Sequence, residues 1–276
     1  MHYTKMHGAG NSFLLVENLH DELQGEDPGI LALRLCNPKT GSGADGLIMI
    51  VPADSPADFG MHFYNSDGSV GEMCGNGARC LSRYGVEHGL CSDPDHICIL
   101  TAAGLVFGRR ISQERYEIRL NDPSVIDLAR QTGGIGGLDC CFYVELGSPG
   151  IPHAVVLTDA DAFEDLDTLR ERGRALRHSS VFPKGANVTF VAPLSESVVR
   201  AITFERGVEN FTLACGTGCG AVAVCLILGG IVSGNPITVR MPGGDLSVRL
   251  TVRDDTVSDI LLTGQTAVVE QGEFSL

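Results

Sequence analysis

The chain has 276 residues, a formal net charge of −14 and 43% hydrophobic residues. At about 150 residues per domain this length predicts one large or two medium domains, and the hydrophobic content excludes a disordered chain. Nucleic acids and anionic lipids are bound by basic patches, whereas this chain has 20 basic against 34 acidic residues. A small molecule is therefore the expected partner, with no nucleic acid and no membrane.

The pattern of apolar residues predicts a β-rich mixed protein of the α/β (α+β) class with few helices. Expected strands cover 13–17, 46–51, 61–64, 96–101, 105–110, 116–120, 141–146, 154–157, 186–191, 201–205, 237–240, 246–252 and 257–263. Expected helices cover 29–36, 75–88, 166–177 and 216–228. The last of these is apolar all round and is expected to be buried on every side, whereas 75–88 carries Arg79, Arg83 and Glu87 and is expected to be less enclosed.

One plan of elements occurs twice. A strand, a turn and then CGNGARC with a helix surround residue 74, and a strand, a loop and then CGTGCGA with a helix surround residue 215. The chain is therefore expected to consist of two similar halves. Residues 121–137 contain NDPS and TGGIGGL, which favour turns, so this stretch is predicted to cross between the halves, with the boundary near residue 120.

No targeting or membrane segment is expected. The first residues, MHYTKMHGAGNSF, lack the apolar stretch of a secretory signal, and the apolar run at 221–232 is too short to span a membrane. A cytoplasmic location is therefore expected. The ten cysteines are expected to be reduced thiols there.

Cys74 and Cys215 each stand where a turn meets a predicted helix start. The positive end of a helix lowers the pKa of a thiol from about 8.5 toward neutrality, and the N–H groups of the first turn can hold a carboxylate. Two such thiols on opposite faces of one carbon would invert its stereocentre, one as thiolate base and the other as thiol acid. The pair predicts a racemase or epimerase that works without pyridoxal phosphate or any other cofactor.

Other uses of the cysteines are less well supported. A lone Cys-Gly at a helix start is usually a packed residue, and packing is the expected role of the remaining eight: Cys36, Cys80, Cys91, Cys98, Cys140, Cys141, Cys219 and Cys225. The spacings contain no C-x2-C pair, so no metal site is expected and a zinc-stabilised structural protein is disfavoured. Neither nucleotide-binding glycine fingerprint is present.

Six blocks of the sequence resemble the diaminopimelate epimerase family, the cofactor-independent two-cysteine enzymes of lysine and cell-wall precursor synthesis. They are MHGAGNSF (6–13), GADGL (43–47), NSDGSVGEMCGNGARC (65–80), PKGANVTFV (183–191), ERGVENFTLACGTGCGAVAV (205–224) and MPGG (241–244). The resemblance implies two pseudo-symmetric halves, each a barrel-like sheet around a central helix, with the ligand cleft between them. It also implies that the last strand returns to the first half, so that 1–120 plus 264–276 form the half with Cys74 and 121–263 the half with Cys215.

The resemblance also implies roles for individual residues. Cys74 and Cys215 are the acid/base pair, supported by His153 and Glu205. The substrate-binding positions are Asn11, Asn65, Gly75, Asn76, Asn187, Glu205, Arg206, Gly216 and Thr217. The implied reaction interconverts LL- and meso-2,6-diaminopimelate. The sequence does not reveal the oligomeric state, and a homodimer is kept as an expectation.

Three positions depart from the family pattern. Ile151 stands where an asparagine commonly precedes Pro-His, Ser148 occupies the related earlier position, and Phe211 replaces a usual glutamate. Because these changes affect recognition and leave both thiols intact, the reaction type is better supported than the substrate. A racemase of histidine or glutamate and a non-catalytic amino-acid-binding protein remain the alternatives.

Overall fold

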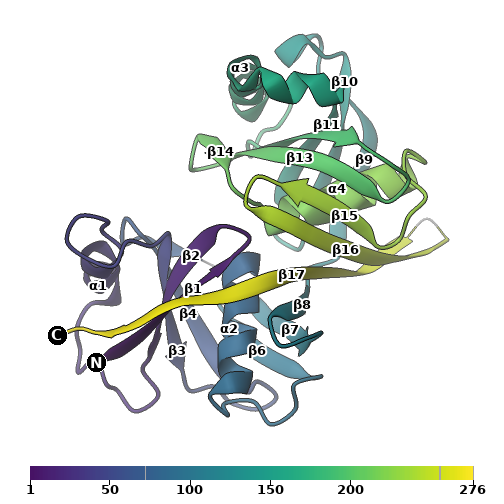
Figure 1. Ribbon diagram of the computed structural model, residues 1–276. Coiled ribbons are helices and arrows are strands. Elements are labelled where there is room, and N and C mark those ends of the chain that lie inside the picture. Colours follow the sequence, from purple (N-terminus) through teal and green to yellow (C-terminus); the bar gives the residue numbers. More distant parts are fainter. Residues whose placement is uncertain (72, 255, 276) are drawn as a thin grey trace. The chain divides into compact units, whose positions relative to one another are not determined.

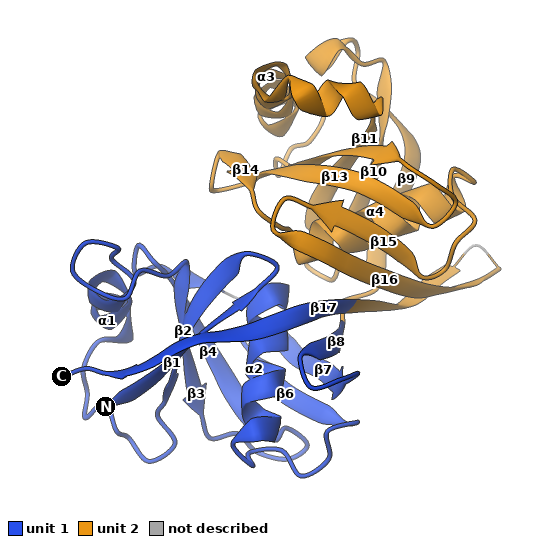
Figure 2. Ribbon diagram, in the orientation of Figure 1, with its two compact units in different colours: residues 1–118, 263–276 blue, residues 119–262 orange. Residues whose placement is uncertain are grey.

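The computed structural model describes residues 1–71, 73–254 and 256–275, so Glu72, inside the matched block 65–80, lies outside the described residues. The chain divides into two compact units, Met1–Ile118 with Thr263–Leu276 and Arg119–Leu262 (Figure 2). Among the described residues, no helix is long and apolar enough to cross a membrane.

Unit 1 is a closed barrel of strands with a helix inside it (Figure 1). Its elements are β1 (His2–Gly8), β2 (Asn11–Glu17), α1 (Pro28–Leu35), β3 (Gly46–Val51), β4 (Phe59–Asn65), β5 (Val70–Gly71), α2 (Gly75–Glu87), β6 (Ile97–Thr101), β7 (Gly104–Arg110), β8 (Arg115–Arg119) and the end of β17 (Thr256–Glu273). β17 closes the barrel because it pairs with β1, from Gly8↔Thr266 to His2↔Glu273, and with β8. The last strand of the chain therefore enters the first unit's sheet from Thr263 onward.

Unit 2 repeats this order of elements. It contains β9 (Pro123–Gln131), η1 (Ile135–Gly137), β10 (Cys140–Leu146), β11 (Ile151–Leu157), η2 (Ala160–Glu164), α3 (Leu166–Arg177), β12 (Asn187–Pro193), β13 (Val198–Glu205), β14 (Asn210–Thr212), α4 (Gly216–Leu228), β15 (Ile237–Met241) and β16 (Gly244–Arg253). β10 through β16 pair as β1 through β7 do: β11–β12 and β13–β15 are parallel like β2–β3 and β4–β6, and the other pairs are antiparallel. The duplication expected from the cysteine turns thus extends to the whole pairing scheme.

A turn-rich crossing was expected at 121–137, and that expectation is wrong for most of the stretch. Residues 123–131 form β9, which pairs with β10 from Pro123↔Leu146 to Gln131↔Cys140. Only the glycines that follow make a turn, with positive φ at Gly133, Gly134, Gly136 and Gly137. The hydrogen bonds and packing available beside β10 outweigh the turn preference of NDPS, because strand formation depends strongly on context.

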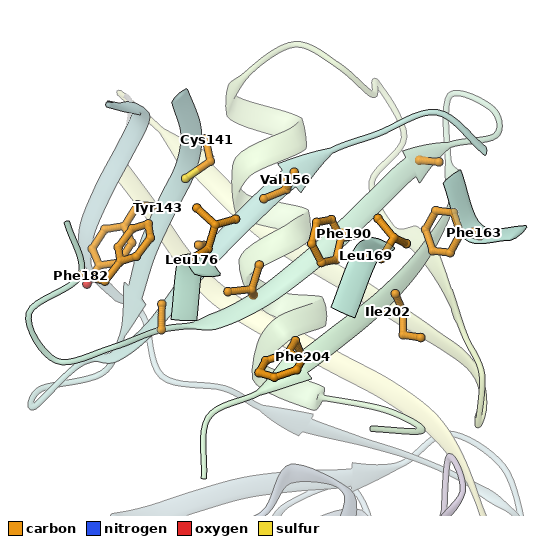
Figure 3. Close-up of a cluster of buried hydrophobic side chains, with 14 residues drawn as sticks. Cys141, Tyr143, Val156, Phe163, Leu169, Leu176, Phe182, Phe190, Ile202 and Phe204 are labelled. Atoms are coloured by element: carbon orange, nitrogen blue, oxygen red, sulfur yellow. The ribbon is translucent and has the colours of Figure 1, made fainter. Parts of the chain in front are cut away.

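Each sheet is covered by one helix outside and one inside. In unit 2, α3 contributes Leu169 and Leu176 to an outer core with Phe190 and Phe204 (Figure 3). Side chains alternate along a strand, so on β12 Val188 and Phe190 face α3 whereas Asn187 and Thr189 face α4. This alternation directs the polar residues of β12 toward the inner helix.

The two inner helices differ in composition but are both enclosed. α4 is buried from Gly216 to Leu226 except at Thr217, as expected for a helix without a polar stripe. α2 is also buried from Gly75 to Gly85, with Arg79 fully buried, so the expectation of a less enclosed helix is wrong. Several of its polar groups are hydrogen-bonded, as in Arg83 to Glu87 and to the Thr266 carbonyl, and this lowers the cost of burying them.

The enclosure of α4 predicts unequal costs for two leucines on the same helix. Leu226 is fully buried and Leu228 only half-buried, so Leu226→Ala should lower the free energy of unfolding by about 2–5 kcal/mol. Leu228→Ala should cost clearly less, and urea denaturation of both variants measures the difference. Equal costs would contradict a helix enclosed at Leu226 and open at its end.

Candidate active site

The two cysteine turns have the same backbone conformation. Cys74 is the N-cap of α2 with φ −130° and ψ 118°, and Cys215 is the N-cap of α4 with φ −124° and ψ 108°. The N–H groups of a helix's first turn have no partner within the helix. Each unit therefore carries a thiol next to backbone donors, at Gly75 and Asn76 in unit 1 and at Gly216 and Thr217 in unit 2.

The second glycine of each turn leaves room for the thiol. A Cβ on Gly218 would lie 3.1 Å from Cys215 Cβ and 3.2 Å from its Sγ, and one on Gly77 would lie 2.8 Å from Ile48 Cδ1 and 3.6 Å from Cys74 Cβ. The sequence alone suggested that these glycines serve a close approach of ligand. In the structure, crowding by Cys215 at Gly218 and by Ile48 at Gly77 is already a reason for glycine at these two positions.

Cys215 lies among three polar partners. The Gly218 N–H donates to its Sγ at 3.3 Å, and the thiol itself donates to Glu205 Oε1 at 3.5 Å, with Thr217 Oγ1 at 3.6 Å. Glu205 ends β13, and its other oxygen accepts from Thr212 Oγ1 of β14 at 3.4 Å. The β13–β14 hairpin thus holds a carboxylate against the thiol.

Burial, reinforced by the Glu205 charge, raises the pKa of the Cys215 thiol well above its ordinary value. Burial also raises the pKa of Glu205. The expected lowering of the thiol pKa by the helix end is therefore wrong for Cys215, because loss of water and a neighbouring carboxylate outweigh the helix dipole. At neutral pH Cys215 is a thiol able to donate a proton.

His153 forms no hydrogen bond with the thiol in the described part of the chain. It is fully buried on β11, in register with Asn187 on β12, and neither ring nitrogen has a hydrogen-bond partner among the described residues. Burial, together with the charge of Arg206, lowers the pKa of His153 to about 3, so the ring is neutral. Of the two residues expected to support the cysteine pair, Glu205 is hydrogen-bonded to Cys215, whereas the role of His153 stays a prediction.

Asn187 and Arg206 lie together at the ends of β12 and β13. The Arg206 backbone N–H donates to Asn187 Oδ1 at 2.7 Å, and its guanidinium donates to the Lys184 carbonyl at 3.1 Å. The Arg206 side chain is exposed and forms no ion pair with any acidic group in the described part of the chain. The other N–H groups of the Arg206 guanidinium have the geometry to bind a carboxylate.

In unit 1 the predicted asparagines divide into two groups. Buried Asn76 donates to Asn11 Oδ1 and accepts from Arg79 at 2.7 Å, so these two predicted residues are in contact. Asn65 instead donates to Ser69 Oγ at 2.9 Å within the turn that follows β4. Arg79 was not among the predicted site residues. The one feature of the sequence that could have indicated it is a charged residue in a helix start that follows a cysteine.

The three departures from the family pattern have identifiable positions. Ile151 begins β11, half-buried opposite Leu146, and Ser148 lies in the preceding turn. Phe211 packs edge-to-face against Phe190 at 6.4 Å and Phe204 at 6.0 Å between ring centroids. Position 211 thus contributes to the core of unit 2, where a carboxylate would lose its hydration.

Cys140 is exposed, so the expectation that it is packed is wrong. The other seven cysteines expected to be packed are buried. Within the described ranges, no group of three or more His, Cys, Asp or Glu side chains is placed to hold a metal ion.

Solved structures share this fold over the whole chain. A probable proline racemase from Agrobacterium radiobacter K84 superposes with TM-score 0.67 at 18% identity, covering 100% of this chain and 93% of that one. A phenazine biosynthesis protein of the PhzF family from Bacillus anthracis gives TM-score 0.70 at 16% identity, covering 100% and 99%. The predicted fold class, two similar α/β units with a helix inside each sheet, is confirmed, and the chain is a protein of this two-unit fold.

Sequence comparison identifies the family. The family model for diaminopimelate epimerase matches residues 3–114 and 146–269. The diaminopimelate epimerases of Aquifex aeolicus and Moorella thermoacetica are 35% and 34% identical; both alignments cover 100% of this chain, with 98% and 100% of those proteins. The chain belongs to the diaminopimelate epimerase family, which confirms the predicted family and the predicted enzyme class, an isomerase.

The contact between Glu205 and Cys215 predicts how the thiol titrates. Because the Glu205 charge raises the thiol pKa, Glu205→Gln should shift the midpoint of the pH–rate curve for iodoacetamide alkylation of Cys215 to lower pH. Mass spectrometry of the Cys215 peptide measures the rate separately from that of exposed Cys140. Glu209→Gln is the matched control, since that carboxylate pairs with Arg177 and His178 instead. An equal shift in both variants would contradict a specific effect of Glu205.

Proposed function

We propose that this protein epimerises LL- and meso-2,6-diaminopimelate by a two-base mechanism without pyridoxal phosphate, in L-lysine and peptidoglycan precursor biosynthesis. The observation that carries the proposal is the repeated N-cap cysteine, with one conformation at the start of both inner helices. Relatives named diaminopimelate epimerase over their full length support the choice of substrate. A cytoplasmic homodimer is part of this proposal.

In the proposed reaction both thiols act on the same α-carbon. A thiolate removes the α-proton, the bond electrons remain on the substrate as an enolate-like carbanion, and the thiol of the other cysteine donates a proton to the opposite face. One proton is taken up and one is given, so the two cysteines have exchanged protonation states after each turnover. No redox change or external reactant is required.

The carbanion needs stabilisation next to the carboxylate of the reacting centre. We assign this to the first-turn N–H groups at Gly75, Asn76, Gly216 and Thr217, which are donors oriented before the charge develops. The charge is greater in the carbanion than in the substrate, so these donors bind the intermediate more strongly.

The raised pKa of Cys215 supports one assignment of the starting roles. In the resting enzyme Cys215 is the proton donor, and Cys74 supplies the base of the first half-reaction. In the reverse direction Glu205, 3.5 Å from the thiol, is placed to accept its proton. Its raised pKa makes Glu205 a stronger base than an exposed carboxylate.

We assign the distal end of the substrate to polar side chains of the predicted set. Arg206, with exposed donors, suits a carboxylate, and Asn187 lies beside it. Asn65 and Asn11 complete the proposed set, and His153, which is neutral and buried, supports the site without changing its charge.

Ile151 and Phe211 favour a second candidate, a racemase of histidine or glutamate with the same mechanism. Each replaces a polar family residue with an apolar one, and Phe211 is held in the aromatic core of unit 2. A smaller substrate with one amino acid group would require fewer distal contacts.

Deuterium exchange distinguishes these candidates. Reduced protein incubated in deuterated water with LL-diaminopimelate should incorporate deuterium at one α-carbon, as followed by NMR and mass spectrometry. Exchange with histidine or glutamate alone would move the assignment to a racemase. Binding without exchange for every amino acid would indicate a non-catalytic binding protein and overturn the proposal.

Each thiol should be indispensable. Cys74→Ala and Cys215→Ala should each reduce kcat for inversion by at least about 10²-fold, since each removes one acid/base group. Cys140→Ala, at an exposed thiol outside the site, should leave kcat near that of the native protein. Substantial inversion by either of the first two variants would contradict the two-base mechanism.

A further inference from the structure

The first two turns of α2 contain a buried guanidinium. Arg79 is fully buried and donates to Asn76 Oδ1 at 2.7 Å and to the Gly75 carbonyl at 3.4 Å. A buried cation needs hydrogen bonds in place of water, and these two bonds fix the guanidinium against the residues that follow Cys74.

This cation determines the orientation of two amides. A guanidinium has donors and no acceptor, so the Asn76 atom facing it must be the oxygen. The Asn76 amide nitrogen then points to Asn11, where it donates to Oδ1. The Asn11 nitrogen is consequently directed away from this chain of bonds, and it donates to no described residue.

The backbone holds Asn11 in place. Asn11 begins β2 directly after the two-residue turn Ala9-Gly10, where both residues have positive φ, 51° and 85°, as in a tight hairpin. A Cβ on Gly8 would lie 3.1 Å from the Asn76 carbonyl and 3.5 Å from the Arg79 guanidinium. The end of the β1–β2 hairpin is therefore packed closely against the start of α2.

We propose that Arg79 is a positioning residue that sets the polarity of Asn11 through Asn76, so that Asn11 presents two N–H donors and selects a carboxylate over an ammonium group of the substrate. The inference rests on the proposed function. It adds Arg79, a residue that does not touch the substrate. It also explains why Asn11 would bind the carboxylate of an amino acid group and not its ammonium.

Variants at Arg79 test the chain of bonds by kinetics. Arg79→Met should raise KM for LL-diaminopimelate about tenfold or more, with a smaller change in kcat, because Asn76 and Asn11 are then free to rotate. Arg79→Lys, which keeps a charged donor, should restore part of the loss. Arg83→Met is the matched control, because it removes the other buried arginine of α2, which bonds to Glu87 and Thr266. An equal rise in KM for Arg79→Met and Arg83→Met would overturn the proposal.

A double-mutant cycle tests polarity without removing the cation. Asn76→Asp still accepts from Arg79 but cannot donate to Asn11, so the Asn11 amide should turn its nitrogen inward and its oxygen outward. Asn76→Asp and Asn11→Ala should each raise KM about tenfold, and the double variant should be no worse than either single one. A KM effect equal to the product of the single effects would overturn the proposal.

An NMR measurement separates this inference from the proposed function. In native protein without substrate, the side-chain NH₂ of Asn76 should exchange slowly with solvent and that of Asn11 rapidly. Arg79→Met should make both exchange rapidly, whereas Arg83→Met should not. Slow Asn76 exchange with no turnover of LL-diaminopimelate would overturn the substrate assignment alone, and rapid Asn76 exchange in an active native enzyme would overturn the role of Arg79 alone.

Discussion

Both units depend on one constraint: a helix enclosed by strands must supply its charged side chains with hydrogen-bond partners or carry none. α4 follows the second course and has no charged residue between Gly216 and Leu228, whereas α2 follows the first, with Arg79 and Arg83 bonded to neighbouring oxygens. In both helices the N-cap is a cysteine whose backbone is extended rather than helical. Each enclosed helix therefore begins with a thiol beside the backbone N–H groups of its first turn.

Enclosure also controls the proton affinity of the groups near the thiols. For Cys215 and Glu205 it raises the pKa of both, so the proton stays on sulfur while the carboxylate remains within reach. Burial lowers the pKa of His153 to about 3, which keeps the ring neutral. Loss of water therefore favours the uncharged form of each of these three groups in unit 2.

The two units reach the same topology with different interiors. Corresponding strands pair in the same sense, and α1 and α3 cover corresponding outer faces. In unit 1, β17 pairs with β1 and closes the sheet. In unit 2, β9 pairs with β10. Closure removes exposed sheet edges, which accounts for a chain whose last strand returns to the first unit.

The sequence by itself determined the duplication, most strands, the four helices and the pair of cysteine turns, because these depend on local periodicity and on motifs that recur in the family. Only the tertiary structure decided the features that depend on neighbours distant in the chain. Strand β9 formed against the turn preference of NDPS because β10 supplies its hydrogen bonds, and Arg79 is buried because Asn76 and Gly75 satisfy it. The protonation of Cys215 was likewise decided by burial and by Glu205 on another strand, since a helix end acts locally but desolvation depends on everything packed around the thiol.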